Sequence, residues 1–360
     1  MGRMLKEELK KRNLPSLQTR EEMMEILQRE VYGYLPQMKY SISVSQPQTK
    51  ENRFACGSVE HSYVNLTVSL ETGKHTFRVD RLLHNDGRKR PLVLLNNFHP
   101  MGSTPYFPME ELSEADIDFL VFCYRDIASD DGDFSSGLAK LLLPEGQKTN
   151  ETCGKIGIWA WAAMRVLDYG LTLEGTEANN VAIAGHSRLG KTALYTAMMD
   201  ERFRFVFSNA AGCAGDSLAH GNSGLGREKR TSELGELICD IVKNFPDWFC
   251  KNYAKYAETN IAETFDQHFL LATLAPRYVM VGSCDLDAWA DPKSQQLCAL
   301  AAGKAWENVG LPGLIGPDRY LNAGEALTDG NVGYFLIHSK HFLSRHGWKY
   351  FLEFIEKHKI

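Results

Sequence analysis

The sequence has no long apolar run, no closely spaced cysteine pair and no large excess of either charge sign. Its longest apolar stretch, Ile156–Met164, is about half of the ~18 residues that a membrane-spanning helix needs. The 40 basic and 45 acidic residues give a formal net charge of -5, and no basic stripe occurs. This charge pattern is not that of a nucleic-acid-binding protein. We therefore expect neither a membrane nor a nucleic acid as a partner.

The N-terminus also lacks the features of a secretory signal. Residues 1–11 are charged and include no apolar core and no small-residue cleavage site. The eight cysteines include no C-x-x-C pair, and several lie inside apolar stretches, which indicates buried thiols in a reducing compartment. These features predict a cytoplasmic protein. Separately, we expect no metal ion and no cofactor. They leave its oligomeric state open.

The early part of the chain predicts a helix followed by antiparallel strands. Thr19 and Glu22 have the spacing of a capping box, which opens a helix over about residues 19–34. Alternating apolar and polar residues at about 57–83 then indicate a β-hairpin. No linker or internal repeat separates this part from the rest. We therefore expect a single domain over residues 1–360.

From Pro91 onward, short apolar runs alternate with helical stretches. The predicted strands contain Leu92–Leu95, Phe119–Cys123, Val181–Ala184, Phe205–Phe207, Tyr278–Val281 and Tyr334–Ile337. The predicted helices include Ile156–Tyr169, Lys191–Met199, Pro292–Asn308 and Trp348–Lys357. Wholly apolar strands separated by helices are typical of a mostly parallel sheet covered on both faces. The fold class is therefore α/β.

Residues 185–192 fit two incompatible chemistries. Read as G-x-x-x-x-G-K-[ST], they form a Walker A phosphate loop. Read as a strand, turn and helix around Ser187, they form a variant of the nucleophile elbow of an α/β-hydrolase. Both interpretations need the predicted strand before the motif and the predicted helix after it.

The rest of the chain favours the elbow over the phosphate loop. The motif lies halfway along the chain, and the first acidic residue after Tyr278–Val281 is Asp285, too late for the usual magnesium ligand. A hydrolase needs a serine, an acid and a histidine in that order. Ser187, then Asp285 or Asp287, and finally His341 supply them. The motif departs from G-x-S-x-G, because its second glycine comes one residue late.

Residues 185–193, Gly-His-Ser-Arg-Leu-Gly-Lys-Thr-Ala, resemble the G-[CH]-S-R-x-G-K-x-A signature of glucuronoyl esterases, carbohydrate esterase family fifteen. The late glycine belongs to that signature. Residues 245–250, 266–277, 287–292 and 333–348 are similar to further segments of the family. The resemblance implies an α/β-hydrolase fold, a three-layer sandwich with a mostly parallel sheet and an antiparallel N-terminal hairpin.

The resemblance also implies an activity. Such enzymes are serine esterases that cleave esters of the (4-O-methyl-)glucuronic acid carboxyl group on xylan-derived saccharides through an acyl-enzyme. Ser187 matches the nucleophile, His341 the general base and Arg188 the oxyanion residue. Lys191 and Glu236 match residues that hold sugar hydroxyls, and Trp248 matches a tryptophan that lines the sugar site.

Two positions depart from the family pattern. Ala210 stands where fungal members carry the catalytic acid, so Asp287 takes that role, with Asp285 as the alternative. Phe342 stands where an aspartate usually follows the histidine, which leaves the local hydrogen bonding of His341 open.

Other interpretations of the same residues remain. An acetyl xylan esterase or another small-ester hydrolase would use the same triad, whereas a non-catalytic sugar-binding relative would not need both Ser187 and His341. His338 and His346 compete with His341 as the base. Trp248 fits core packing nearly as well as sugar stacking, Glu236 fits a solvated helix acid, and Lys191 fits a surface lysine. His268, among apolar neighbours, is interpreted as a core histidine.

Overall fold

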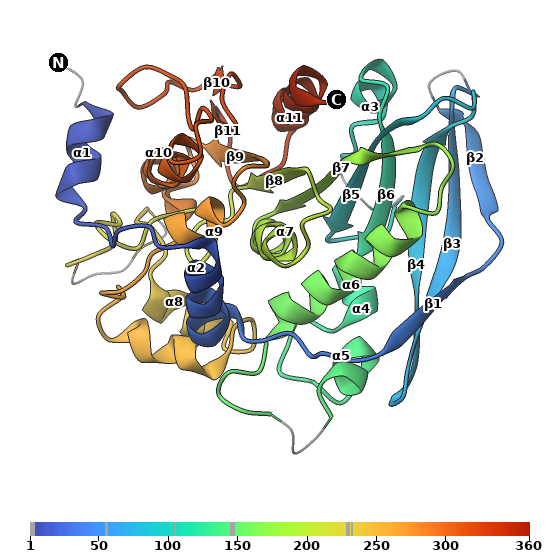
Figure 1. Cartoon of the computed structure of the whole chain (residues 1–360), viewed down its shortest axis with the longest axis horizontal. Helices are drawn as coiled ribbons and strands as arrows, with labels where there is room; N and C mark the ends of the chain where they lie inside the picture. Colours follow the sequence, from blue (N-terminus) through green and yellow to red (C-terminus); the bar gives the residue numbers. More distant parts are fainter. Residues whose placement is uncertain are drawn as a thin grey trace.

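The described strands form one 11-stranded sheet (Figure 1). The computed structural model describes residues 4–54, 57–101, 103, 106–144, 148–227, 231 and 233–360. The strands are β1 Tyr40–Val44, β2 Gln48–Phe54, β3 Val59–Leu70, β4 Gly73–His84, β5 Arg90–Asn97, β6 Asp118–Cys123, β7 Thr176–His186, β8 Phe205–Asn209, β9 Tyr278–Cys284, β10 Glu325–Leu327 and β11 Val332–Ile337. Their order is β1-β3-β4-β6-β5-β7-β8-β9-β11-β10, with β2 paired to β3.

The centre of this sheet is parallel and its two edges are antiparallel. Strands β6, β5, β7, β8, β9 and β11 pair in parallel, and each contains one of the predicted apolar runs. At one edge β3 and β4 form the predicted hairpin, closing at the pair Leu70 and Gly73. The expected mostly parallel sheet with an N-terminal antiparallel hairpin is confirmed. The carboxyl ends of β7, β9 and β11, where Ser187, Asp287 and His341 follow, lie at the same edge of the sheet.

Helices cover both faces of the sheet (Figure 1). They are α1 Leu5–Lys11, α2 Arg20–Leu27, α3 Met109–Glu114, α4 Tyr124–Ile127, α5 Gly137–Leu142, α6 Lys155–Gly170, α7 Arg188–Met199, α8 Ile238–Asn244, α9 His268–Ala272, α10 Pro292–Glu307 and α11 Arg345–His358. Helices α6, α7 and α10 pack on one face, and α3 and α11 pack on the other.

Alternate side chains of the central strands enter two separate cores. Leu92 and Leu94 of β5 pack in the core that contains α6, α7 and α10, whereas Val93 enters the core of α11 around Trp348. All three β5 side chains are fully buried. Because burial of one such side chain contributes roughly 1.5–3 kcal/mol, a strand that is apolar on both faces is stable only between two helical layers.

The capping box at Thr19 forms as predicted. The Thr19 side chain accepts a hydrogen bond from the Glu22 backbone, and the Glu22 carboxylate accepts one from the Thr19 N–H. After Leu27 the helix continues as a π-helical turn, Gln28–Tyr32, and ends at Gly33. This turn buries Tyr32, whose hydroxyl donates to the Ala214 carbonyl at 2.6 Å. The N-terminal segment is thereby fixed to the loop that follows β8.

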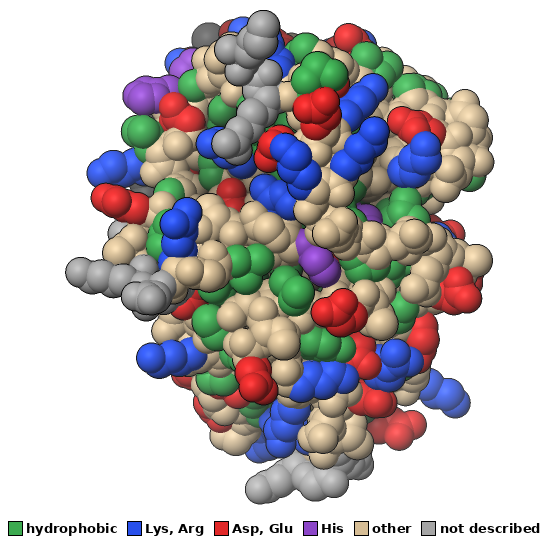
Figure 2. Space-filling view, turned by 90° about the vertical axis from the view of Figure 1, so that its left-hand side faces the viewer, with side chains coloured by type: hydrophobic (Ala, Val, Ile, Leu, Met, Phe, Trp, Pro, Cys, Tyr) green, Lys and Arg blue, Asp and Glu red, His purple; other side chains and the backbone are tan. Residues whose placement is uncertain are grey.

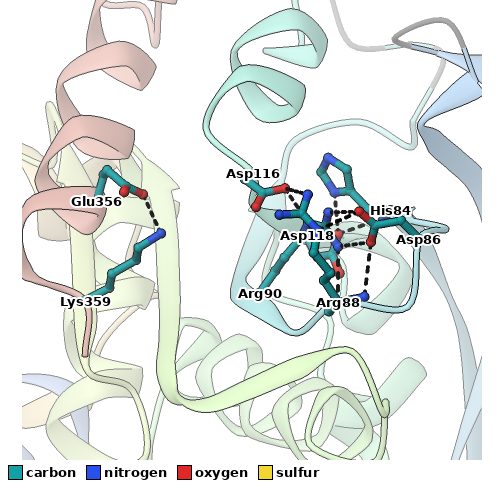
Figure 3. Close-up of polar contacts among 8 residues, drawn as sticks. All are labelled: His84, Asp86, Arg88, Arg90, Asp116, Asp118, Glu356 and Lys359. Carbon is teal, nitrogen blue, oxygen red and sulfur yellow. Dashed lines mark hydrogen bonds and ion pairs between the residues drawn. The ribbon is translucent and has the colours of Figure 1, made fainter.

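A charged cluster lies at the amino end of β5 (Figure 3). This end of the sheet is opposite to the edge at which Ser187, Asp287 and His341 follow their strands. The Arg90 side chain is 1% exposed and pairs with Asp86 and Asp116 at 2.6 Å each. Beside it His84 Nδ1 lies 2.9 Å from Asp118 Oδ1. Arg90 is thus fully used in holding the turn between β4 and β5 to β6.

The surface carries both charge signs. On the face shown in Figure 2, acidic and basic side chains are scattered among apolar and uncharged atoms. This distribution agrees with the small net charge of the sequence. Within the part of the chain that the structure describes, no helix combines the length and the apolar character required to cross a membrane.

Candidate active site

Ser187 lies on a strained turn between β7 and α7. Its backbone has φ 57° and ψ -127°, which a non-glycine residue rarely adopts. Such strain persists only where the surroundings hold it, and here the Ser187 N–H donates to the Asn209 carbonyl at 2.8 Å. A Cβ at Gly185 would lie 2.0 Å from the Leu189 carbonyl oxygen. The tight turn therefore requires glycine before the serine.

The second glycine explains why the motif departs from G-x-S-x-G. A Cβ at Gly190 would lie 3.1 Å from both the Ala211 Cβ and the Ser208 Oγ. The first turn of α7 is therefore packed so closely against β8 and the loop after it that a side chain at this position would have little room. Leu189, one position earlier, is fully buried instead.

The predicted base and acid lie together at the carboxyl ends of β11 and β9. His341 Nδ1 is 2.6 Å from Asp287 Oδ2. The Asp287 side chain is 5% exposed, and it also accepts the Ala290 N–H at 3.3 Å. A buried carboxylate on Nδ1 fixes the imidazole tautomer and leaves Nε2 as the reactive nitrogen.

His186 connects this pair to the elbow. Its ring centroid lies 4.5 Å from that of His341, and Ser187 is the next residue in the chain. Asn209 Nδ2 donates to His186 Nδ1 at 2.8 Å and to the Phe342 carbonyl at 3.3 Å. Burial, followed by the neighbouring His341, lowers the pKa of His186 to about 3. A neutral ring therefore packs against His341, and Asn209 links this ring to the backbone of Phe342, the residue after His341.

The competing residues are placed elsewhere. Asp285 Oδ2 lies 2.8 Å from Nδ1 of His338, whose side chain is 73% exposed. His346 lies in the first turn of α11. The position after β8 is occupied by Ala210, which is buried and has φ 49°. Because an alanine stands there, this position offers no carboxylate. Among the described carboxylates, only that of Asp287 lies within hydrogen-bonding distance of His341.

Arg188 provides donors next to the serine. It is the first residue of α7, so its backbone N–H has no acceptor within the helix. Its guanidinium pairs with Asp130, a residue in the loop between α4 and α5. The sequence analysis missed Asp130, because nothing in the sequence distinguishes it from its acidic neighbours Asp131 and Asp133.

Lys191 and Glu236 are both buried, at 3% and 6% exposure. Lys191 Nζ donates to the Ala211 carbonyl. Burial raises the pKa of Glu236, and the charge of Lys191 opposes that rise. The interpretations of Lys191 as a surface lysine and of Glu236 as a solvated acid are therefore wrong.

Comparison with known proteins places this chain in a family. Residues 104–310, more than half of the chain, match the family model described as glucuronyl esterase of fungi. The chain belongs to the glucuronoyl esterase family. This assignment and the hydrolase fold rule out the phosphate-loop interpretation of residues 185–192.

Individual relatives agree with this family assignment. A carbohydrate esterase of an unknown prokaryotic organism is 31% identical over 240 residues, covering 66% of this chain and 52% of that protein. A 4-O-methyl-glucuronoyl methylesterase of Wolfiporia cocos is 27% identical, covering 69% of this chain and 62% of the relative. The chain thus spans between half and two thirds of the length of these curated relatives. A solved glucuronoyl esterase from Solibacter usitatus superimposes with a TM-score of 0.81 at 26% identity, covering 94% of this chain and 91% of its own.

Two tryptophans lie near the residues that the family resemblance assigns to the sugar. Trp248 is 5% exposed, stacks on Phe245 with ring centroids 3.8 Å apart, and donates Nε1 to Asp130 at 2.8 Å. Its role in lining the sugar site stays a prediction. Trp289, which the sequence analysis did not single out, accepts the Glu236 N–H at its carbonyl at 2.8 Å. A hydrogen bond from Trp289 also acts to lower the pKa of Glu236.

Further buried polar groups lie outside the candidate site. His268 is buried and its Nε2 lies 2.9 Å from the Pro15 carbonyl, as expected of a core histidine. Six of the seven described cysteines are buried, and Cys56 lies outside the described residues. Among the described residues, no group of three or more His, Cys, Asp and Glu side chains is arranged to hold a metal ion.

Proposed function

We propose that this chain is a serine esterase that hydrolyses esters of the glucuronic acid carboxyl group, including its 4-O-methyl form. The observation that supports this most is the 2.6 Å contact between His341 and Asp287. The His341 ring also lies 4.5 Å, centroid to centroid, from that of His186, the residue that precedes Ser187. Relatives named 4-O-methyl-glucuronoyl methylesterases support the same substrate class.

The proposed reaction proceeds in two halves. His341 Nε2 takes the proton of Ser187 as Oγ attacks the ester carbonyl carbon, and the same proton then goes to the leaving alcohol. Water attacks the resulting acyl-enzyme, again with His341 as the base, and releases the free glucuronic acid and Ser187. Asp287 holds the imidazole and stabilises its charged form. The reaction needs water as its only co-reactant.

Negative charge on the carbonyl oxygen requires donors beside Ser187. The backbone N–H of Arg188 and its guanidinium are the proposed donors, and one such donor is typically worth ~10²–10³ in turnover. Lys191 and Glu236 would bind sugar hydroxyls, with Trp248 against the ring. These contacts accelerate the reaction only when the sugar is the acyl group, because only then do they position the carbonyl.

A direct comparison of substrates tests the proposal. We expect purified protein to cleave benzyl glucuronate with a higher kcat/KM than acetylated xylose, and Ser187→Ala to abolish both activities. A preference for acetylated xylose would instead support the acetyl esterase alternative. Absence of hydrolysis with every ester would refute the esterase proposal altogether. Xylan as the source of the saccharide and the cytoplasm as the site of action stay predictions.

A further inference from the structure

Asp130 is the common acceptor for three donors, two of which come from distant parts of the chain. Its Oδ1 accepts the indole N–H of Trp248 at 2.8 Å. Its Oδ2 accepts the hydroxyl of Tyr124 at 2.9 Å and also pairs with Nη1 of Arg188. The carboxylate is only 9% exposed. A buried carboxylate is stable only when such donors are present, so this position is built around the charge.

The guanidinium of Arg188 lies among aromatic rings on the same side. Its Cζ is 4.5 Å from the ring centroid of Trp248, 5.3 Å from that of Phe245 and 5.7 Å from that of Phe98. These separations are within the range of cation–π attraction. Trp248 contacts both partners, since its ring faces Arg188 while its N–H is bound to Asp130. The arginine side chain, which is flexible when free, is therefore confined.

The hydrogen bonds of the Arg188 guanidinium show which of its edges is free to bind another group. Nη1 is engaged by Asp130, and Nε is buried without an acceptor among the described residues. Nη2 donates to no described residue, and the side chain keeps 23% of its surface exposed. The Nη2 edge is therefore the part of the guanidinium that can meet a group arriving beside Ser187.

We propose that Asp130 is a positioning residue that fixes the guanidinium of Arg188 for the oxyanion of the ester reaction, an inference that rests on the proposed function. The carboxylate offsets part of the arginine charge, which by itself would weaken oxyanion binding. This cost is offset because Asp130 holds the guanidinium in place. The arginine side chain then does not have to reorganise during the reaction, as a free arginine would. An oxyanion forms with every ester, so the effect of Asp130 should not depend on the sugar.

A double-mutant cycle with Arg188 tests this proposal. Asp130→Asn should lower kcat by about 10- to 100-fold, as expected when a reacting group is misplaced by about an ångström. KM should change little, and the loss should be the same for a simple aryl acetate and for benzyl glucuronate. In the Arg188→Met background, Asp130→Asn should cause no further loss. A similar loss in both backgrounds would show that Asp130 acts independently of Arg188 and would overturn the proposal, as would unchanged kcat in Asp130→Asn.

Two further variants serve as controls. Asp131→Asn alters the same loop at a side chain that is 60% exposed and does not contact Arg188, so its kcat should match the wild type. Tyr124→Phe removes one donor to Asp130 without changing charge, and it replaces Asp130→Asn if that variant does not fold. Its smaller loss of kcat should also vanish with Arg188→Met, and persistence there would count against the proposal. If the wild-type protein cleaves only the aryl acetate, the assignment of glucuronate esters as substrates is refuted. The double-mutant cycle of Asp130 and Arg188 can still be measured with the aryl acetate.

Discussion

His341 Nδ1 lies 2.6 Å from Asp287 Oδ2, whereas Asp285, two residues earlier, lies 2.8 Å from Nδ1 of the exposed His338. The two loops run side by side, because the Asp285 N–H donates to the Ile337 carbonyl and the Leu286 N–H donates to the Ser339 carbonyl. This backbone pairing brings each carboxylate to a different histidine. Of the two carboxylates, Asp287 is the more deeply buried, with a side chain that is 5% exposed against 27% for Asp285.

The two carboxylates give a matched test of the triad. Asp287→Asn should keep the fold but favour the wrong tautomer of His341, with a loss of up to ~10⁴ in kcat. Asp285→Asn should leave kcat within a few-fold of the wild type, since His338 takes no part in the reaction. Steady-state kinetics on an activated ester measures both. Near-normal turnover in Asp287→Asn would transfer the role of the acid to another residue.

Lys191 and Glu236 should determine selectivity for the sugar. Lys191→Met and Glu236→Gln should lower kcat/KM for benzyl glucuronate at least tenfold more than for a simple aryl acetate, which has no sugar on its acyl side; tenfold corresponds to about 1.4 kcal/mol of binding energy in the transition state. Both residues are buried, so thermal melting must accompany the kinetics. Lys304→Met, at a lysine that is 66% exposed, provides the control. Equal losses on both substrates would assign the two residues to the fold or the triad.

His186 should make the protein less stable in acid. Its pKa is lowered from 6.5 to about 3, mainly by burial. Between these values the unfolded chain binds a proton at this histidine and the folded chain does not, so stability falls as the pH falls. The contribution to the slope is about 1.4 kcal/mol per pH unit. Above pH 6.5 both states are neutral here and the contribution ends.

The measurement compares the pH dependence of unfolding in two proteins. His186→Phe removes the titrating group, so its free energy of unfolding should decline less steeply between pH 6.5 and 4 than that of the wild type. The variant loses the hydrogen bond from Asn209, which shifts its stability at every pH but leaves the slope comparison intact. Parallel curves would mean that His186 also takes up a proton in the folded protein.

Arg90 should matter for stability and not for activity. Arg90→Met should lower the melting temperature by several degrees, because Asp86 and Asp116 lose the buried one of their two shared arginine partners and keep only the exposed Arg88 (Figure 3). Hydrogen bonds from Arg90 and then Arg88 lower the pKa of Asp86. The stability gained from this pair is therefore present at neutral pH and is lost as Asp86 is protonated in acid. Below the folded-state pKa of Asp86, its part of the difference between wild type and variant should disappear.

Turnover of Arg90→Met at 25 °C should match the wild type, since Arg90 begins β5 and the triad follows the carboxyl ends of the strands. Thermal melting at several pH values and ester hydrolysis at one temperature check both halves of this expectation. A loss of kcat without a loss of stability would contradict it.

The sequence by itself determined the architecture and predicted the serine and the histidine proposed to react. Strands such as β5 are apolar on both faces, a pattern that is stable only between two helical layers. The strands of the central parallel sheet could therefore be predicted from the sequence. The elbow at Ser187 is local, because the space at its two glycines is limited by atoms within a few residues or on the adjacent strand and the loop after it. The order of Ser187, Asp287 and His341 followed from the same kind of pattern and from the family resemblance.

Only the tertiary structure decided which residues support them. Asp130, His186 and Trp289 act through contacts with segments far away in sequence, and no spacing rule connects Asp130 to Arg188 or to Trp248. The choice between Asp285 and Asp287 likewise depended on how two loops at the edge of the sheet pair with each other. Burial, which sets the protonation of His186 and Glu236, is a property of the folded packing and has no local signature in the chain.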